Sequence, residues 1–98
     1  MALPASGTTD IPTAGTRVRI NNTPRRVFSL LLKARNGNTG SIYVGDSGVS
    51  STNGFELRAN EAYSVNYAAA RQTARMDDFW ADTATNGNDV DWFAMLAP

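Results

Sequence analysis

The stretch from Asn36 to Glu61, NGNTGSIYVGDSGVSSTNGFELRANE, constrains the fold more than any other part of this chain. It contains two short runs, Ser41–Val44 and Phe55–Arg58, in which apolar and polar side chains alternate. Such alternation is typical of half-buried β-strands. A connection rich in glycine and serine separates the two runs. The stretch therefore predicts a pair of short strands, the building block of a compact β-sandwich.

Glycine flanks both of these runs, at Gly40, Gly45, Gly48 and Gly54. Because glycine has no Cβ, it adopts positive φ angles at no steric cost, and we expect these four positions to mark turns or bulges. None of the residues between them has an obvious catalytic role. We therefore interpret these glycines as residues that shape the fold, not as residues that hold a ligand.

Alternation of apolar and polar residues, or the turn signals that bound a run, predict further strands in the rest of the chain. These strands are Arg17–Ile20, Val27–Arg35, Tyr63–Tyr67, Met76–Thr83 and Val90–Leu96. The run Val27–Arg35 is expected to be a central strand, with one face formed by Phe28, Leu30, Leu32 and Ala34. The segment Ala68–Arg75 is rich in helix-forming residues but short, so it is either a helical turn or a connecting loop.

Asparagine and glycine indicate how these strands are joined. The sequence Asn36-Gly37-Asn38 predicts a hairpin that leads into Ser41–Val44, and Thr85–Asn88 predicts a hairpin between the last two strands. The final strand, Val90–Leu96, has apolar residues on both faces. This pattern indicates that its second face is covered as well, either by the same chain or by a partner.

Turn signals recur about every eight to twelve residues, which is typical of small antiparallel β-folds. We therefore predict an all-β fold of about seven or eight short strands, either a small antiparallel β-sandwich or a jelly-roll-like barrel. A length of 98 residues is sufficient for one domain. Residues 1–15 are expected to form an extended N-terminal arm, docked or frayed, and residues 16–98 a single β-sandwich domain.

The nine Lys and Arg residues balance nine Asp and Glu residues, so the formal net charge is zero. Because nucleic-acid binding depends on phosphate neutralisation, we expect no nucleic-acid partner. All basic residues lie at or before Arg75, whereas five aspartates follow it. Either these charges form ordinary solvated strand faces, or the basic and acidic parts meet between neighbouring subunits. Eight of the nine basic residues are arginine, which suits protein interfaces better than lysine does.

Histidine and cysteine are absent. Their absence removes disulfides, thiolate nucleophiles, most zinc sites and the usual general base. The serines and threonines consequently have no histidine to activate them, and the glycine-rich stretches match no phosphate-binding fingerprint. We accordingly expect no enzymatic activity, no catalytic residue and no cofactor.

Two further groups of residues carry side chains of a kind that can bind a ligand. Asp89 and Asp91 share a strand face and could bind a cation together with Asn86 or Asn88, but their spacing matches no calcium motif and hairpin-turn chemistry is the preferred interpretation. Trp80 and Trp92 could form a stacking platform for sugar rings. A place in the core or at a subunit interface is the more common role of tryptophan.

No run is long and apolar enough to cross a membrane. The first sixteen residues contain no Lys or Arg and are interrupted by Pro4 and Pro12, unlike a secretory signal. We therefore expect no membrane partner and no export through a membrane.

The order of several motifs is informative when they are taken as a set. The run Gly40-x-Ile42-Tyr43-Val44-Gly45 is followed by Gly54-x-x-Leu57 and Glu61, then by Phe79-Trp80-Ala81-Asp82-Thr83 and Asn86-Gly87-Asn88-Asp89-Val90. From Asn36 to Leu96 this order resembles that of small tailed-bacteriophage virion proteins of the capsid decoration (cement) or head-fibre type. The chain departs from their pattern at Asn60, where those proteins prefer glycine, and at Phe79-Trp80, where an aliphatic residue and tyrosine are usual.

The resemblance implies a bacteriophage structural protein, such as a capsid decoration protein that stabilises the outer capsid through multivalent contacts. The implied partners are the major capsid protein and other copies of this chain, as a homo-oligomer with a trimer favoured. Such a protein is made in the host cytoplasm and resides on the capsid surface of the virion. A tail, fibre or connector component, or a receptor- or glycan-binding module of the virion, is the alternative.

We expect the arm and the last, aromatic strand to make the subunit and capsid contacts. The candidate interface residues are Leu3, Ile11, Pro12, Arg17, Arg19, Trp80, Trp92, Phe93 and Met95.

Overall fold

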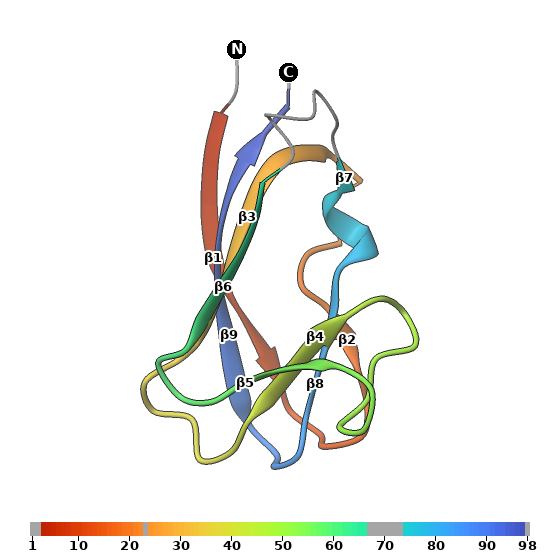
Figure 1. Cartoon of the computed structure of the whole chain (residues 1–98), viewed down its shortest axis with the longest axis vertical. Coiled ribbons are helices and arrows are strands. Elements are labelled where there is room, and N and C mark those ends of the chain that lie inside the picture. The colour runs from red at the N-terminus through yellow and green to blue at the C-terminus, as the bar shows by residue number, and fades with distance from the viewer. Residues whose placement is uncertain (1–2, 23, 67–73, 98) are drawn as a thin grey trace.

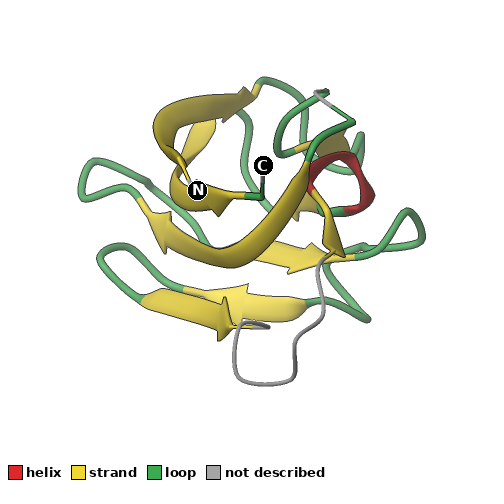
Figure 2. Ribbon diagram, turned by 90° about the horizontal axis from the view of Figure 1, so that it is seen from above, coloured by secondary structure: helices red, strands yellow, loops and turns green. Residues whose placement is uncertain are grey.

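The computed structural model describes residues 3–22, 24–66 and 74–97. Within these residues the chain forms two antiparallel β-sheets that pack face to face as a sandwich (Figures 1 and 2). The all-β prediction is confirmed, and of its two forms the sandwich is correct, because the sheets do not close into a barrel. The sandwich is elongated, with principal extents of 38 × 25 × 20 Å.

The larger sheet has the strand order β1-β9-β3-β6, with β7 also pairing with β3. Its strands are β1 (Leu3–Ile11), β3 (Arg26–Ala34), β6 (Ala62–Asn66), β7 (Ala74–Arg75) and β9 (Asn88–Leu96). The smaller sheet has the order β2-β8-β4-β5. Its strands are β2 (Val18–Arg19), β4 (Ile42–Gly45), β5 (Phe55–Leu57) and β8 (Trp80–Thr83). A short 3₁₀ helix, η2 (Met76–Asp78), precedes β8.

The segment predicted as an N-terminal arm is extended, but most of it pairs with its own chain. Leu3–Ile11 forms β1, an edge strand whose nine residues pair in continuous register with β9, from Leu3 opposite Leu96 to Ile11 opposite Asn88. The connection to β2 is also fixed, because Ala14 N–H donates to Asn86 Oδ1 at 2.7 Å and Gly15 N–H donates to Asp82 Oδ1 at 3.0 Å. The sandwich therefore includes residues that we had assigned to a separate arm.

The predicted central strand is confirmed as β3, which lies between β9 and β6. Leu30, Leu32 and Ala34 face the core, as expected. The prediction for Phe28 is wrong, since Val27 is fully buried in its place and Phe28 is only half-buried. The cause is a register shift between Val27 and Ser29 in the pairing with β9. An irregularity of this kind shifts the alternation of side chains by one residue.

The pairing of β4 with β5 confirms the hairpin predicted across the glycine- and serine-rich connection. The other two predicted hairpins are wrong, because β3 and β4 belong to different sheets, and so do β8 and β9. The turn residues instead connect the layers. Asn38 exchanges two hydrogen bonds with the backbone of Asp89, at 2.8 and 2.9 Å, and Asn88 Oδ1 accepts one from Thr39 N–H at 2.9 Å.

The explanation offered for Gly40, Gly45, Gly48 and Gly54 is also wrong, since positive φ occurs at none of them. Close approach explains two of these positions instead. A Cβ at Gly40 would collide with the Thr85 side chain, and a Cβ at Gly54 would lie 2.6 Å from Val49 Cγ2 and 2.7 Å from Tyr43 Cβ. The connection between β4 and β5 thus folds back over the smaller sheet and buries Val49 there.

Asn60 is the non-glycine residue with positive φ, 72°, among the described residues. Asparagine tolerates this left-handed conformation better than most residues, which explains why it stands where the resembled proteins prefer glycine. Asn60 lies in the turn between β5 and β6. Two hydrogen bonds, both of 2.8 Å, hold this turn: Asn60 N–H donates to Ala34 O, and Arg58 N–H donates to Glu61 Oε1. The spacing from Leu57 to Glu61 therefore has a structural cause in this chain: Asn60 turns the backbone and the Glu61 side chain binds back to Arg58.

One hydrophobic core fills the space between the sheets. It consists of Ile11, Ile20, Val27, Leu30, Leu32, Ala34, Ile42, Val44, Leu57, Met76, Ala81, Val90 and Ala94. At the end of the sandwich away from the termini, the side chain of Asn88 is also buried and donates to Thr83 Oγ1 at 2.8 Å. The predicted strand Tyr63–Tyr67 corresponds to β6, although Tyr67 and most of Ala68–Arg75 lie outside the described residues.

Candidate functional site

The candidate interface residues do not form one continuous surface. The structure places two groups of them on the opposite outer faces of the sandwich and two residues toward its interior. We call Phe93 and Met95, together with the neighbouring Leu31, the apolar surface, and Arg17, Arg19 and Trp80 the Arg–Trp surface.

The apolar surface lies on the outer face of the larger sheet. Leu31 of β3 and Phe93 of β9 are register partners, so their side chains emerge side by side. They are 41 % and 46 % exposed, while their neighbours Ala94 and Leu30 are buried, which places them on the side away from the core. Met95 follows on the same face and is half-buried. Large apolar side chains at the centre of an outer sheet face are unusual in a monomer and mark an interaction site when they are contiguous.

Leu31 was not among the predicted interface residues. The alternation in Val27–Arg35 had assigned it to the outer face, but its neighbour Phe93 is distant in the sequence. Only the antiparallel pairing of β3 with β9 brings these two side chains together. The prediction for Phe93 and Met95 rested on apolar residues on both faces of the last strand. In β9, Phe93 and Met95 are indeed more exposed than Ala94, which lies between them and is buried.

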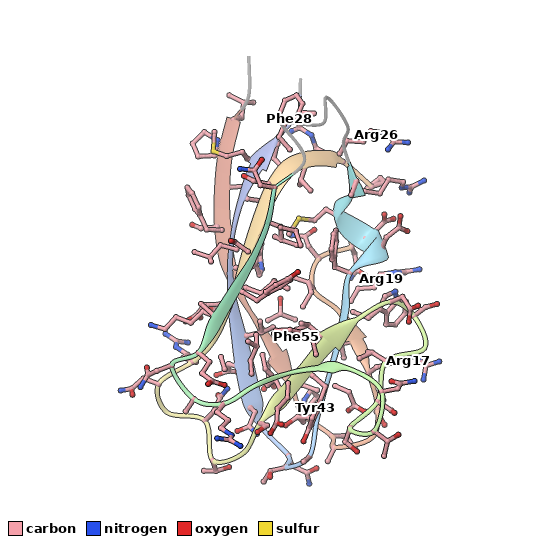
Figure 3. All side chains as sticks on the ribbon, in the orientation of Figure 1. Arg17, Arg19, Arg26, Phe28, Tyr43 and Phe55 are labelled. Atoms are coloured by element: carbon pink, nitrogen blue, oxygen red, sulfur yellow. The ribbon has the colours of Figure 1, made fainter. Side chains whose placement is uncertain are left out.

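The Arg–Trp surface lies on the outer face of the smaller sheet. Arg19 of β2 and Trp80 of β8 are register partners. The guanidinium carbon of Arg19 lies 4.8 Å from the centroid of the Trp80 ring, and that of Arg17 lies 6.0 Å from it. Figure 3 shows both arginines extending from the same side of the molecule. Cation–π contacts of this kind hold the two guanidinium groups beside the indole.

Trp92 and Ile11 face the interior. Ile11 is fully buried at the end of β1, so it belongs to the core and not to an exposed interface. Trp92 packs against the same core, and its indole lies over Gly7 of β1. Trp80 and Trp92 therefore lie in different sheets and form no common platform for a sugar ring.

The remaining two candidates are exposed near opposite ends of β1. Leu3, the first residue of β1, pairs with Leu96, the last residue of β9 (Figure 1), and it is 46 % exposed. Pro12 follows the last residue of β1 and is exposed as well. Neither side chain belongs to the apolar surface or to the Arg–Trp surface.

Three aspartates lie on the outer face of the larger sheet, nearer the start of β9 than the apolar surface. Asp10 and Asp89 are register partners, and Asp91 lies two residues further along β9. Partial burial raises the pKa of Asp89, and its hydrogen bond and repulsion with Asp10 act in the same direction. Thr8 Oγ1 donates to Asp91 Oδ1 at 2.7 Å, and Arg35 Nε lies 3.8 Å from the same oxygen.

These aspartates were weighed as cation ligands with Asn86 or Asn88. Asn88 is directed into the core, and Asn86 Oδ1 accepts a hydrogen bond from the Ala14 backbone. The part of the chain that the structure describes contains no group of three or more acidic side chains arranged to hold a metal ion. The asparagines of this turn thus serve the connection between the two layers.

An apolar cavity of about 170 Å³ opens between the sheets beside β5 and β6. It is lined by Leu32, Val44, Gly45, Phe55, Tyr63, Val65 and Phe79. Phe55 and Tyr63 stack at its mouth, with ring centroids 4.5 Å apart and planes inclined by 32°. The alternation in Phe55–Arg58 places Phe55 on the same strand face as the buried Leu57, but Phe55 is 52 % exposed, because β5 is an edge strand and the sandwich is open on this side.

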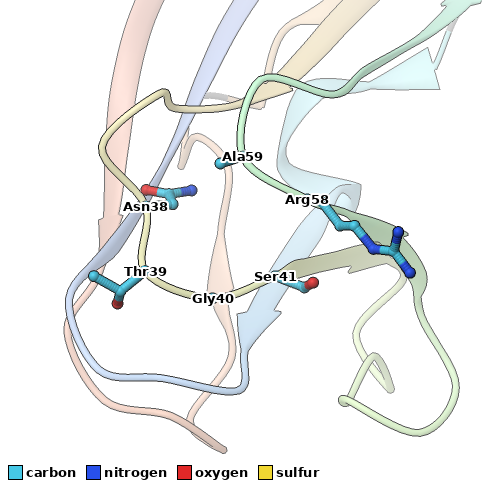
Figure 4. Close-up of a pocket in the computed structure, with 6 residues that line it drawn as sticks. All are labelled: Asn38, Thr39, Gly40, Ser41, Arg58 and Ala59. Carbon is cyan, nitrogen blue, oxygen red and sulfur yellow. The ribbon is translucent and has the colours of Figure 1, made fainter.

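A second, polar hollow of about 240 Å³ lies at the end of the sandwich away from the termini. Residues 38–41 form one side of it and Arg58 with Ala59 the other (Figure 4). The Arg58 side chain points away from this space in Figure 4, and Ser41 Oγ donates to Glu56 Oε2 at 2.6 Å. Its polar groups therefore do not converge on a ligand.

The sequence matches no protein-family model, and no curated protein is significantly similar to it. Within the described ranges, no helix has the length and apolar character needed to span a bilayer.

Proposed function

We propose that this chain is a structural protein of a bacteriophage virion, specifically a capsid decoration protein that binds the outer capsid and stabilises it through many repeated contacts. The observation that carries the proposal is the apolar surface, where Leu31 and Phe93 lie exposed side by side on the outer face of the larger sheet. The motif order from Asn36 to Leu96 supports the class of protein, and the confirmed sandwich fold agrees with it.

The position of the apolar surface supports docking by a flat face. It is formed by β3 and β9, the two inner strands of the larger sheet, and each is held by neighbours on both sides. Contacts made by such strands need no rearrangement on binding, which lowers the entropic cost of each contact. A symmetric capsid presents the same site many times, so modest individual affinities are sufficient when copies are linked to one another.

The Arg–Trp surface supplies a second face for a neighbour. It lies in the other sheet, so one copy can present its apolar surface to the capsid while Arg17, Arg19 and Trp80 remain available to a second copy. Arginine and tryptophan are the residue types most enriched in the energetic centres of protein interfaces. This arrangement supports the expected homo-oligomer, for which we retain the trimer as the favoured form.

Binding to particles assembled without this protein tests the proposal. Phe93→Ser and Leu31→Ser should each weaken co-sedimentation with undecorated capsids at least about tenfold, because each removes more than about 1.4 kcal/mol of apolar burial. Phe55→Ser is the matched control, since Phe55 is at least as exposed but lies on the open side of the sandwich. It should leave capsid binding unchanged.

Two outcomes would contradict the proposal. If the unchanged protein does not bind undecorated capsids but does bind isolated tails or fibres, the tail, fibre or connector alternative replaces decoration. If Phe55→Ser weakens binding as much as Phe93→Ser, the apolar surface is not the docking face. Mass measurement of the free protein and of Trp80→Ser tests separately whether copies associate through the Arg–Trp surface.

A further inference from the structure

The chain contains three Asn-Gly sequences, Asn36-Gly37, Asn53-Gly54 and Asn86-Gly87. In such a pair the glycine backbone nitrogen can attack the asparagine side-chain carbon Cγ, because no Cβ obstructs its approach. The new N–Cγ bond closes a succinimide ring, the Cγ–Nδ2 bond breaks, and ammonia leaves with the proton of the glycine nitrogen. Water then opens the ring at either carbonyl and produces aspartate or isoaspartate. The reaction needs water alone.

Two of the three pairs are held in a way that opposes this attack. Gly54 N–H donates to Ser50 O at 3.1 Å, and Asn53 Oδ1 accepts from Ser50 N–H at 2.7 Å while its Nδ2 donates to Gly48 O at 3.0 Å. The attacking nitrogen and the amide it would attack are therefore both engaged. Gly54 is in addition packed against Val49 and Tyr43, so this turn cannot open without losing buried contacts.

The pair Asn86-Gly87 is engaged in the same manner. Gly87 N–H donates to Ile11 O at 3.1 Å, at the end of β1, and Asn86 Oδ1 accepts from Ala14 N–H at 2.7 Å. Both bonds join segments that are far apart in the sequence. Freeing the Gly87 nitrogen therefore requires separation of β1 from the start of β9.

The pair Asn36-Gly37 differs from both. Among the described residues the Gly37 N–H has no hydrogen-bond acceptor, and apart from Gly37 and its two chain neighbours no atom lies within 4 Å of where its Cβ would be. Both residues are exposed in a turn held by one backbone bond, from Asn38 N–H to Arg35 O at 3.1 Å. Asn36 Oδ1 accepts from Asn60 Nδ2 at 2.8 Å, as the other two asparagines accept at their Oδ1 atoms, so the three pairs differ at the glycine nitrogen.

We propose that Asn36 is a site of spontaneous deamidation and isomerisation in the folded protein, while Asn53 and Asn86 are protected by the hydrogen bonds of their glycine nitrogens. The product places a carboxylate, and in the isoaspartyl form one additional backbone methylene, in the connection between the two sheets. This inference does not depend on the proposed virion role.

Peptide mapping of the folded protein after incubation at mildly alkaline pH tests the inference. Cleavage after Arg35 and Arg58 releases one peptide with both Asn36 and Asn53, and cleavage after Arg75 releases residues 76–98 with Asn86. Fragment masses within the first peptide distinguish the two asparagines. Asn36 should convert at least about tenfold faster than either of the others, because hydrogen bonds must break before those sites react.

Two controls complete the experiment. The chain unfolded in urea should convert all three asparagines at similar rates, because the protecting bonds are absent. Gly37→Ala should slow conversion of Asn36 in the folded protein, and the open space around Gly37 allows the substitution without loss of the fold. If Asn53 or Asn86 reacts as fast as Asn36 in the folded protein, or if Asn36 is as slow as they are, the proposal is wrong.

Discussion

The indole of Trp92 lies across Gly7, its register partner in the edge strand β1, so closely that a Cβ at Gly7 would be 2.8 Å from Trp92 Cζ2 and 3.0 Å from Cε2. The edge strand can approach β9 and cover this tryptophan only because residue 7 has no side chain. This relationship explains why the amino-terminal segment is bound to the sandwich.

Gly7→Ala should therefore destabilise the protein by about 1–3 kcal/mol, the usual cost of forcing an extra methyl group into a packed site. Urea unfolding followed by tryptophan fluorescence measures this loss. Gly37→Ala is the matched control and should change the free energy of unfolding by less than about 0.5 kcal/mol, since nothing lies within 4 Å of the new methyl group. Equal effects of the two substitutions would show that Trp92 does not require the glycine.

The buried amide of Asn88 links the two sheets. Its Oδ1 accepts from Thr39 N–H, and its Nδ2 donates to Thr83 Oγ1, Gly40 O and Thr85 O at 2.8, 3.2 and 3.3 Å. Asn88→Ala should cost about 3 kcal/mol, because several polar groups at this end lose their partner, each worth about 1–3 kcal/mol when buried. Denaturant unfolding measures this cost, and the exposed Asn22→Ala should leave stability nearly unchanged.

The left-handed backbone at Asn60 predicts a distinct order among substitutions. Asn60→Val should destabilise the protein by about 1–2 kcal/mol, because a β-branched residue fits poorly at a φ of 72°. Asn60→Gly should be close to neutral, since relief at the backbone offsets the lost bond to Asn36. Thermal unfolding of the two variants distinguishes backbone strain from side-chain bonding. An equal loss for glycine and valine would assign the role of Asn60 to its amide, because both substitutions remove that amide.

The raised pKa of Asp89 has a defined effect on stability. Ionisation of Asp89 is harder in the folded protein than in the unfolded chain, so its charge destabilises the fold at every pH above the raised pKa. This penalty is relieved as the pH falls through the raised pKa toward the ordinary value near 3.8. Burial is the main cause, and Asp10 contributes through its hydrogen bond and its charge.

Asp10→Asn should consequently lower the pKa of Asp89 and increase stability at neutral pH. A carbon-detected NMR titration of the Asp89 carboxyl measures the first effect, and denaturant unfolding at neutral pH measures the second. Asp78→Asn removes the same charge from the exposed residue that ends η2 and should leave the Asp89 titration unchanged. An unchanged Asp89 pKa in Asp10→Asn would show that the two carboxyl groups do not interact.

Local pattern alone determined the fold class and most of the strands. Alternation identified β3, β4, β5, β6 and β9 because one face of each strand is turned toward the core, fully buried in β3 and β4 and only partly in β5 and β6, and a core-facing side imposes a period of two on apolar residues. The same alternation assigned Phe93 and Met95 to an outer face. It failed at Phe28, where a register shift changes the face, and such a shift depends on the partner strand.

Only the tertiary structure decided which strands share a sheet, and with that the location of each surface. A turn of asparagine and glycine can close a hairpin within one sheet, or it can carry the chain from one sheet to the other. The turns after β3 and β8 therefore did not reveal that β4 and β9 lie in the opposite sheet. The pairing of Leu31 with Phe93 and the covering of Trp92 by β1 depend on contacts between residues far apart in the sequence. These contacts are selected by burial in three dimensions, since local pattern specifies the face of a strand but not its neighbour.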